Sequence, residues 1–464
     1  SRLPNVRIMD YDDPGFRVYQ EAEEALFLLT PGASLATAEL PLLAQPLPEA
    51  DVPLREAQDA YRFYYIHNPY SDIARYLETM AQPGDAVLLV GPDQRAALQR
   101  FYAGDLPVYE LPQQPPDRAS TLAQLEQIAG QQRRLHVLYR ASEGSDPEGI
   151  VQGWLAEHAY PGRDVWLGPV RAVTTILPGG EAGWSVERPA ANFGGQLQLV
   201  EAARSAQTVQ AGELLALRLA WQTLATPAAD YTLFLQLLDA DGRVAAQRDV
   251  PLLAAGAPAS AWQPGQPAET RVGIALPAGS APGDYRLIAG LYDPQTGQRV
   301  AVDGGASDYV ELGAVAVEAS APGAVDLAAQ RFQPNHAFGE VTLEGFQRTK
   351  QSYDYAPDTP LAPGDVLDLI FTWRAHQQPT IDWALTARLL DENGQSVAGV
   401  TAPLAGPRHP SSQWRAGEMA RGQHSLTLPA DLPPGRYQVQ VAVHRPDDAE
   451  PAGWLKLGKL QVTP

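Results

Sequence analysis

The sequence contains no cysteine, which excludes disulfide bonds, cysteine nucleophiles and thiolate metal sites. No segment shows the pattern of a signal peptide, so we expect none within these residues, and no apolar run approaches the roughly 18 residues that a membrane-spanning helix needs. Lysine is scarce, at Lys350, Lys456 and Lys459, which we attribute to the base composition of the genome. The chain begins at Ser1 instead of Met, so we expect it to be a piece of a longer protein.

Basic residues are outnumbered by acidic ones: 34 Lys and Arg stand against 54 Asp and Glu, a formal net charge of −20. A chain this acidic repels phosphate backbones and anionic lipid faces, so we expect no nucleic-acid partner. Hydrophobic residues at 45% and charged residues at 19% indicate a globular protein. The 464 residues predict about three domains, and 40 glycines and 42 prolines favour many turns between short strands.

The second half of the chain contains an internal repeat at an offset of 152 residues. The repeated residues are Leu215, Leu217, Leu219 and Trp221 with Leu367, Leu369, Phe371 and Trp373, then Gly212 with Gly364, Trp262 with Trp414, and Pro282-Gly283-x-Tyr285 with Pro434-Gly435-x-Tyr437. So many tryptophans, glycines and prolines on one offset predict two copies of one fold. We expect Trp221, Trp373, Tyr285 and Tyr437 to point into the two cores.

Outside that block the offset falls to 145, as between Phe193-Gly194 and Phe338-Gly339. The second copy therefore carries seven extra residues around 351–360, and the first carries seven around 298–309. Each copy alternates apolar and polar residues over runs of about five to eight residues between turns. This pattern predicts immunoglobulin-like β-sandwiches of about seven strands, at residues 190–318 and 325–464.

The first part of the chain predicts a different fold. Strands at 86–90, 108–111 and 135–139 alternate with helical stretches at 93–102, 117–131 and 147–158, after a helix at 70–81 and before one or two strands at 165–177. Such alternation predicts a small parallel sheet, an α/β domain over residues 61–185. Asp146 is the expected N-cap of the third helix and Pro147 its first residue. Residues 1–60 form a lead segment for which the sequence predicts no definite structure.

Several segments are similar to a family of membrane enzymes. They are SDIARYLETMAQPGDAVLL at 71–89, FYAGDLPVYELP at 101–112, TLAQLEQIAGQQRRLHVLYR at 121–140, DPEGIVQGWLAEHAY at 146–160, DVWLGPVRAV at 164–173, YTLFLQLLDADGRV at 231–244 and PGDYRLIAGLYDPQTGQR at 282–299. They resemble bacterial membrane glycosyltransferases of the dolichyl-phosphate-mannose–protein mannosyltransferase class, family 39. In some of those proteins the α/β segment follows the last transmembrane helix and sandwiches accompany it. The resemblance covers most of the chain, residues 60–318 best.

The resemblance implies that this chain is the C-terminal extracytoplasmic region of such an enzyme, at the outer face of the plasma membrane, with a membrane domain upstream of Ser1. The carboxylates that serve glycosyl transfer in the family lie between early membrane helices, and no position here matches them. We therefore expect a non-catalytic accessory region that positions an acceptor glycan or protein. The alternative is a stand-alone secreted protein that binds carbohydrate or protein, and a third hypothesis is a soluble enzyme that uses the α/β domain.

Motifs that would indicate a cofactor, a metal or a nucleophile are missing. The eight histidines show no metal-ligand spacing, and neither HExxH nor GxSxG occurs. Asp239-x-Asp241-Gly242 resembles the start of a calcium loop, but it lacks the distal ligands, and its repeat counterpart 391–394 is typical of a hairpin turn. We predict no cofactor and no metal site.

A ligand site is predicted where the first and third strands of the α/β domain end. Asp93 follows the first strand, and Arg140 and Ser142 follow the third, at the edge where open α/β sheets bind ligands. Arg140 and helix amides could hold a sugar or a phosphate there. Because the GxGxxG pattern is missing, a helix cap and a solvated arginine are the competing interpretation. Some tryptophans are candidates for platforms on which a carbohydrate stacks, and the competing interpretation is that they pack in a core or at its rim. They are Trp154, Trp166, Trp184, Trp383 and Trp454.

Overall fold

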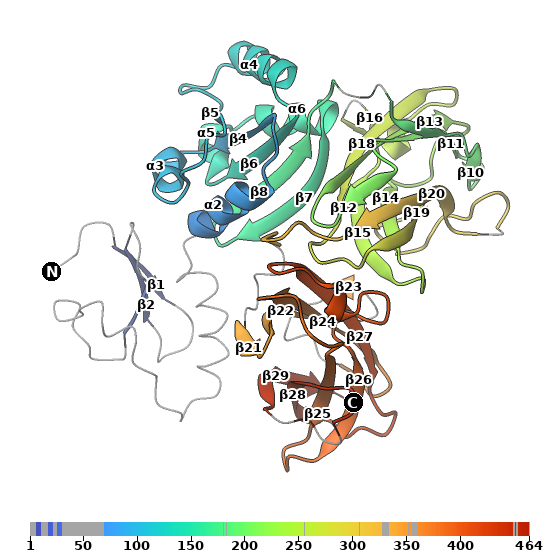
Figure 1. Ribbon diagram of the computed structural model, residues 1–464. Helices are drawn as coiled ribbons and strands as arrows, with labels where there is room; N and C mark the ends of the chain where they lie inside the picture. Colours follow the sequence, from blue (N-terminus) through green and yellow to red (C-terminus); the bar gives the residue numbers. More distant parts are fainter. Residues whose placement is uncertain are drawn as a thin grey trace.

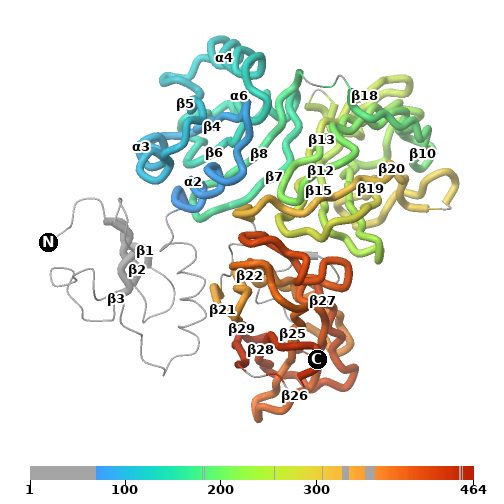
Figure 2. Tube along the Cα trace, viewed as in Figure 1, coloured from blue at the N-terminus to red at the C-terminus, as the bar shows by residue number. Residues whose placement is uncertain are grey.

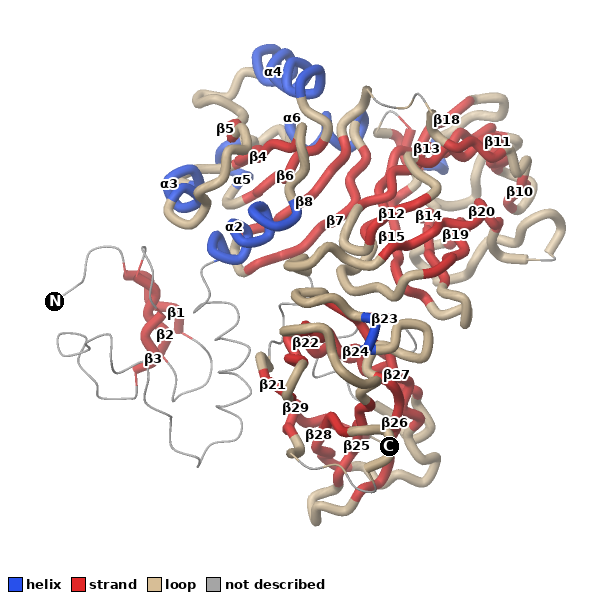
Figure 3. Tube along the Cα trace, viewed as in Figure 1, coloured by secondary structure: helices blue, strands red, loops and turns tan. Residues whose placement is uncertain are grey.

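The computed structural model describes residues 6–10, 17–21, 26–29 and 69–463, apart from 180, 182, 255, 306, 327–333, 351–352, 355–360, 449–450 and 452. Over these residues the chain is mostly β-sheet, in several sheets, with a few helices (Figures 1 and 3). Within the lead segment an antiparallel sheet contains β1 (Val6–Asp10), β2 (Arg17–Glu21) and β3 (Leu26–Leu29). The predicted extra segment at 351–360 lies outside the described residues, except for β23 (Tyr353–Asp354).

A five-stranded mixed sheet follows the lead segment. Its strands in spatial order are β5 (Val108–Glu110), β4 (Asp85–Val90), β6 (Arg134–Tyr139), β8 (Val170–Ile176) and β7 (Tyr160–Leu167). β4 runs parallel to both β5 and β6. β7 and β8 form an antiparallel hairpin, so the sheet is mixed, whereas the strand–helix alternation in the sequence predicts a parallel sheet. The turn at Gly168, whose φ is 55°, is too short for the crossover that a parallel connection needs.

Helices cover both faces of the mixed sheet. α2 (Pro69–Met80) and α3 (Gln94–Gln99) pack on one face, and α4 (Arg118–Gln131) and α6 (Ile150–His158) pack on the other. α5 (Ser142–Ser145) is a single turn. α6 begins later than predicted because a turn follows Asp146. Asp146 still satisfies the helix end, since its carboxylate accepts hydrogen bonds from the N–H groups of Ile150 at 2.8 Å and Val151 at 3.0 Å.

Two facing sheets form the first sandwich. One sheet contains β10 (Ala191–Phe193), β11 (Leu197–Arg204), β13 (Leu214–Thr223) and β18 (Pro267–Ala275) in that order, with β9 (Ser185–Glu187) beside β11. The other contains β12 (Thr208–Gln210), β20 (Val310–Glu318), β19 (Gly283–Tyr292), β14 (Thr232–Leu238) and β15 (Val244–Pro251). A ribbon of β16 (Leu253–Ala254) and β17 (Ala257–Pro258) precedes the short helix η4 (Ala259–Ala261). Trp221 and residues of both sheets share one buried core.

The second sandwich has a corresponding strand order. One sheet contains β21 (His336–Phe338), β22 (Val341–Lys350), β24 (Val366–Ala375) and β27 (Met419–Thr427), with β23 beside β22. The other contains β26 (Ser396–Pro403), β25 (Ala384–Leu390), β28 (Gly435–His444) and β29 (Leu455–Val462). A short helix, η6 (Ser411–Gln413), corresponds to η4. Trp373 is buried in the core between the two sheets.

Local hydrogen bonds recur between the sandwiches at the offset of 152. The Tyr285 hydroxyl donates to the Ala281 carbonyl at 2.8 Å, and the Tyr437 hydroxyl donates to the Pro433 carbonyl at 2.6 Å. The indole N–H of Trp262 donates to the Ala257 carbonyl at 3.2 Å, as that of Trp414 does to the His409 carbonyl at 3.1 Å. These two tyrosines and two tryptophans therefore have satisfied polar groups at matching positions of both sandwiches.

The mixed sheet and the two sandwiches pack together around α2 (Figures 1 and 2). One buried cluster joins Leu77 of α2 with Ala278 of the first sandwich and Met419 of the second. Glycines bring β7 and β18 close, since a Cβ on Gly273 would lie 2.9 Å from the Cα of Gly162. This contact places β7, the edge strand of the mixed sheet, next to the first sandwich.

Candidate functional site

The predicted ligand residues Asp93, Arg140 and Ser142 follow β4 and β6, which are parallel neighbours. The chain passes from β4 to β5 on one side of β4 and returns to β6 on its other side, so a topological switch point lies between the ends of β4 and β6. Asp93 is exposed with a φ of 59°, and Arg140 and Ser142 are half-buried. The fold therefore brings these three positions to one edge of the sheet.

The crevice at this switch point is filled by the side chain of Gln94. Its amide donates to the carbonyls of Val90 and Leu138, each at 3.0 Å, and its carbonyl accepts from the Tyr70 hydroxyl at 3.0 Å. Burial raises the pKa of Tyr70 to about 12, against the influence of its contact with Arg140. A Cβ on Gly91 would lie 1.8 Å from the Arg140 carbonyl oxygen, so the two loops touch. Sequence reasoning missed Gln94, whose position directly after Asp93 was the available signal.

An exposed tryptophan lies farther along the same edge of the sheet. Trp166, near the end of β7, is 54% exposed, the largest value among the large hydrophobic residues that the structure describes. Trp154 is buried, and the remaining platform candidates, Trp184, Trp383 and Trp454, are half-buried. The Arg388 guanidinium further covers Trp454, lying 3.5 Å from the ring centre. Exposure thus selects Trp166 from the five candidates.

Polar side chains flank Trp166 on its own face of the sheet. Arg171 of β8 is its direct cross-strand partner, and Asp164 lies two residues earlier on β7. Arg171 donates from Nε and Nη2 to the two oxygens of Asp164, at 2.9 and 2.7 Å. These hydrogen bonds raise the pKa of Arg171. The Arg171 guanidinium also lies 5.5 Å from the centre of the Tyr139 ring, which holds it in place.

An arginine of the first sandwich lies within electrostatic range of this pair. Arg248 is half-buried on β15, and its side chain interacts electrostatically with Asp164, Arg171 and Asp249. We call the set Tyr139, Asp164, Trp166 and Arg171 the Trp166 surface. An aromatic ring, a fixed carboxylate and a guanidinium group can together stack on a ligand and hydrogen-bond to it, which is the chemistry of a binding site.

Other features of the described residues point less clearly to a ligand. A cavity of about 370 Å³ beside β5 includes Arg95 and Glu110, which pair with each other. In the part of the chain that the structure describes, no group of three or more His, Asp or Glu side chains could hold a metal ion. Among those residues no helix is long and apolar enough to cross a membrane.

Comparisons with known proteins give no assignment. No protein-family model matches the chain. No curated protein matches it either. Solved structures that resemble parts of it include the C-terminal domain of Wzt (15% identity, 29% of this chain and 81% of that chain, TM-score 0.22). Another is a family 123 glycoside hydrolase from Clostridium perfringens (12% identity, 25% of this chain and 27% of that chain, TM-score 0.16). A third is a mutant of Salmonella alpha-2-macroglobulin (14% identity, 66% of this chain and 19% of that chain, TM-score 0.18). At these TM-scores the similarities carry no argument.

Proposed function

We propose that this chain is the extracytoplasmic accessory region of a lipid-linked-sugar-dependent membrane glycosyltransferase, and that it binds the acceptor glycan without catalysing transfer. The observation that carries the glycan-binding part is the exposure of Trp166 beside the fixed pair of Asp164 and Arg171. The enzyme class and the place at the outer face of the plasma membrane rest on the sequence resemblance to family 39.

Stacking is the physical basis of this proposal. The C–H groups on one face of a sugar ring pack on an aromatic face, and a tryptophan offers the largest such face. Sugar hydroxyl groups both donate and accept hydrogen bonds, so a carboxylate and a guanidinium at the edge of the ring suit them. Because Arg171 and Asp164 hold each other, these groups lose little freedom on binding.

We further propose that residues 61–185 form an α/β domain and that residues 190–318 and 325–464 are two copies of one immunoglobulin-like sandwich. The corresponding strand orders and the hydrogen bonds that recur at the offset of 152 support the repeat.

Glycan binding can be tested with a glycan array and purified chain. We expect Trp166→Ala to weaken binding about tenfold, because an aromatic stacking contact is worth up to about 1.5 kcal/mol. Trp454→Ala is the matched control, since this half-buried tryptophan lies on the second sandwich, and it should leave binding unchanged. Equal effects of the two substitutions, or no binding by the unaltered chain, would contradict the proposal.

The non-catalytic part needs a separate assay. We expect no turnover when the chain is incubated with polyprenyl-phosphate sugars, nucleotide sugars and chromogenic glycosides. Turnover that disappears on replacing one particular carboxylate would instead support the soluble-enzyme hypothesis. A stand-alone secreted binding protein would behave like the accessory region in both assays, and the native gene separates these two. Membrane spans encoded upstream of Ser1 support our proposal, and a single signal peptide there supports the alternative.

A further inference from the structure

Three exposed cations lie in a row on the outer face of the second sandwich. They are Arg436 on β28 and Lys459 and Lys456 on β29, which pair in the sheet register with Gln461, Gln438 and Gln440, in that order. The residues between them, such as Tyr437 and Leu460, point into the core. Three successive outward-facing pairs therefore carry one cation each, about 7 Å from one pair to the next along the strands. We call Arg436, Lys459 and Lys456 the cationic row.

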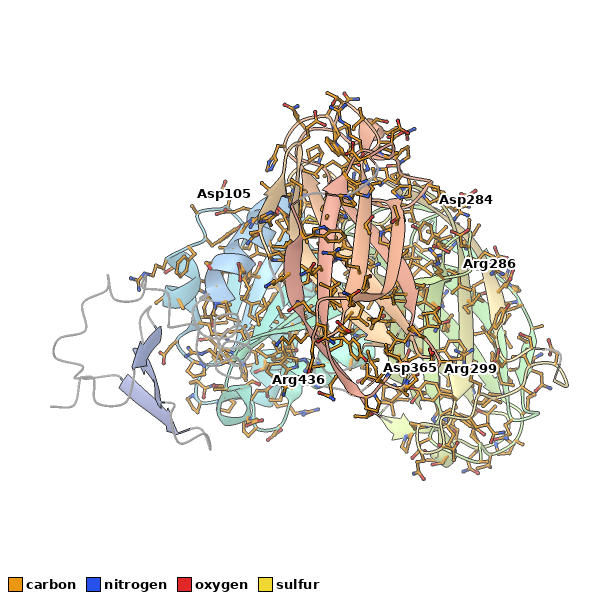
Figure 4. The ribbon with its side chains drawn as sticks, turned by 90° about the horizontal axis from the view of Figure 1, so that it is seen from below. Asp105, Asp284, Arg286, Arg299, Asp365 and Arg436 are labelled. Atoms are coloured by element: carbon orange, nitrogen blue, oxygen red, sulfur yellow. The ribbon has the colours of Figure 1, made fainter. Side chains whose placement is uncertain are left out.

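The matching face of the first sandwich carries no such row. Arg436 corresponds to Asp284 at the offset of 152, and Lys456 corresponds to Glu311 at the offset of 145. The strand pairing is equivalent, with a bulge at the same place. Arg286, a cation of that face, pairs with Glu311 at 2.8 Å, and Figure 4 labels it beside Asp284 on the first sandwich and Arg436 on the second. The shared framework therefore does not require the row, which contains two of the three lysines of a chain with net charge −20.

The sheet that carries the cationic row contains no acidic residue. None of β25, β26, β28 and β29 includes Asp or Glu, and the three cations form no ion pair among the described residues. The first sandwich differs here too, because its matching sheet contains acidic residues on β15, β19 and β20. The side chains of the row are therefore free to pair with an external anion.

Carboxylates near the row lie in the adjoining turns. They are Asp391, Glu392, Asp431, Asp447 and Asp448. Asp391 follows Leu390, two strand spacings or about 10 Å from Lys459. Exposed charges farther apart than about 8 Å are largely screened at physiological salt, so this carboxylate offsets the lysines only weakly. Asp391 and Glu392 interact electrostatically with Tyr437, next to Arg436, so they offset Arg436 more than the lysines.

We infer that the cationic row binds an extended acidic segment of a partner protein, with Asp or Glu at alternate positions. Side chains on one face of an extended chain repeat about every 7 Å, which matches the spacing of the row, so each carboxylate can face one cation. Acidic residues on one face of a helix are about 5–6 Å apart, which fits less well. A flat anionic membrane would also meet the acidic turns at the ends of the sheet. This inference is independent of glycan binding at Trp166.

Fluorescence anisotropy with labelled peptides of equal length tests the inference. The alternating peptide contains Glu-Ser-Glu-Ser-Glu, the clustered peptide contains Glu-Glu-Glu-Ser-Ser, and the neutral peptide contains Gln-Ser-Gln-Ser-Gln. We expect the full chain to bind the alternating peptide about tenfold tighter than the neutral one at low salt, because exposed ion pairs each contribute little. The clustered peptide should bind more weakly than the alternating one. The preference should disappear at about 1 M salt, where charges are screened beyond about 3 Å.

The double variant Lys456→Gln/Lys459→Gln should reduce the preference for the alternating peptide to about twofold or less. Lys350→Gln is the matched control. Lys350 is the remaining lysine of the chain, lies on β22 in the other sheet and pairs with Asp365 at 2.7 Å, so this variant should keep the preference. If the double variant keeps it as well, or if Lys350→Gln loses it equally, the inference is wrong.

Two other outcomes would also refute the inference. Equal binding of the alternating and clustered peptides would show that the row responds to total charge and not to an extended segment. Vesicles of phosphatidylglycerol, or polygalacturonate, that bind through the two lysines while the alternating peptide does not bind would show that the partner is a membrane or a polysaccharide. Each of these outcomes leaves the glycan-binding proposal standing, because that proposal is tested separately by Trp166→Ala.

Discussion

Replacing Arg134 by methionine should destabilise the fold by about 3–5 kcal/mol, because it leaves a buried carboxylate without its partner. Arg134 donates from Nη2 to Asp85 at 2.6 Å, from Nε to both oxygens of Asp85 at 3.0 Å, and from Nη1 to Glu213 at 2.6 Å. Asp85 is 3% exposed and Arg134 is 6% exposed. Glu213 belongs to the turn before β13, so this network also links the mixed sheet to the first sandwich.

The magnitude follows from what remains after the substitution. Asp85 keeps the Gln82 N–H at 2.8 Å and a contact with His136 at 3.2 Å, but it loses its one permanently charged neighbour. The Met80 carbonyl, which accepts from Arg134 at 2.9 Å, loses a donor as well. The double variant Asp85→Leu/Arg134→Met removes both charges, so it should cost about 2 kcal/mol or more less than the sum of the single variants.

Urea unfolding followed by tryptophan fluorescence measures these differences in the free energy of unfolding. Because the mixed sheet and the two sandwiches need not unfold together, the first transition is the one to compare. Arg286→Gln serves as the control, since its exposed pair with Glu311 should contribute about 0–1 kcal/mol. The reasoning fails if Arg134→Met costs no more than Arg286→Gln, or if the effects of the two single variants add in the double variant.

Two further predictions concern the cores and pH. Trp221→Phe should cost about 1–3 kcal/mol more than Trp373→Phe, because the Trp221 N–H donates to Thr270 at 3.2 Å whereas the Trp373 N–H has no partner among the described residues. Equal losses on urea unfolding would contradict this. Burial lowers the pKa of His136 despite its hydrogen bond to Asp85, so the stability from its neutral form is present above about pH 6.5 and lost as pH falls toward the folded pKa. Unfolding midpoints from pH 8 to 5 should therefore fall less in His136→Gln than in the control His376→Gln, and parallel profiles would refute this.

Local patterns in the sequence predicted the elements better than their connections. The apolar run at 86–90 corresponds to β4, and the helical spacing at 117–131 corresponds to α4, which Asp117 caps by accepting from the Ser120 N–H at 2.6 Å. The start of α6 was predicted wrongly, since Asp146 caps it from outside a turn that spacing alone does not reveal. The strands at 165–177 were expected, but their antiparallel direction depends on the turn at Gly168.

The seven extra residues around 298–309 show what a difference in length between the two copies does not predict. The change of offset located this segment in the sequence, but it did not predict which residues the segment contacts. Arg299 in that segment lies 4.4 Å from the ring centre of Phe234 and pairs with Asp308, covering apolar residues on the outer face of the first sandwich. In the second sandwich the position that corresponds to Phe234 is Thr386. This polar residue hydrogen-bonds to Thr401 at 2.8 Å and does not need to be covered.

The sequence by itself determined the repeat, the buried aromatics and the strand–helix alternation, because apolar spacing and turn residues act over a few neighbouring positions. It also marked Trp166 as one of five tryptophans that could bind a sugar. Only the tertiary structure decided which of them is exposed and that Gln94 fills the predicted site between Asp93 and Arg140. Exposure and charge pairing depend on contacts between segments far apart in the chain, and no local pattern encodes those contacts.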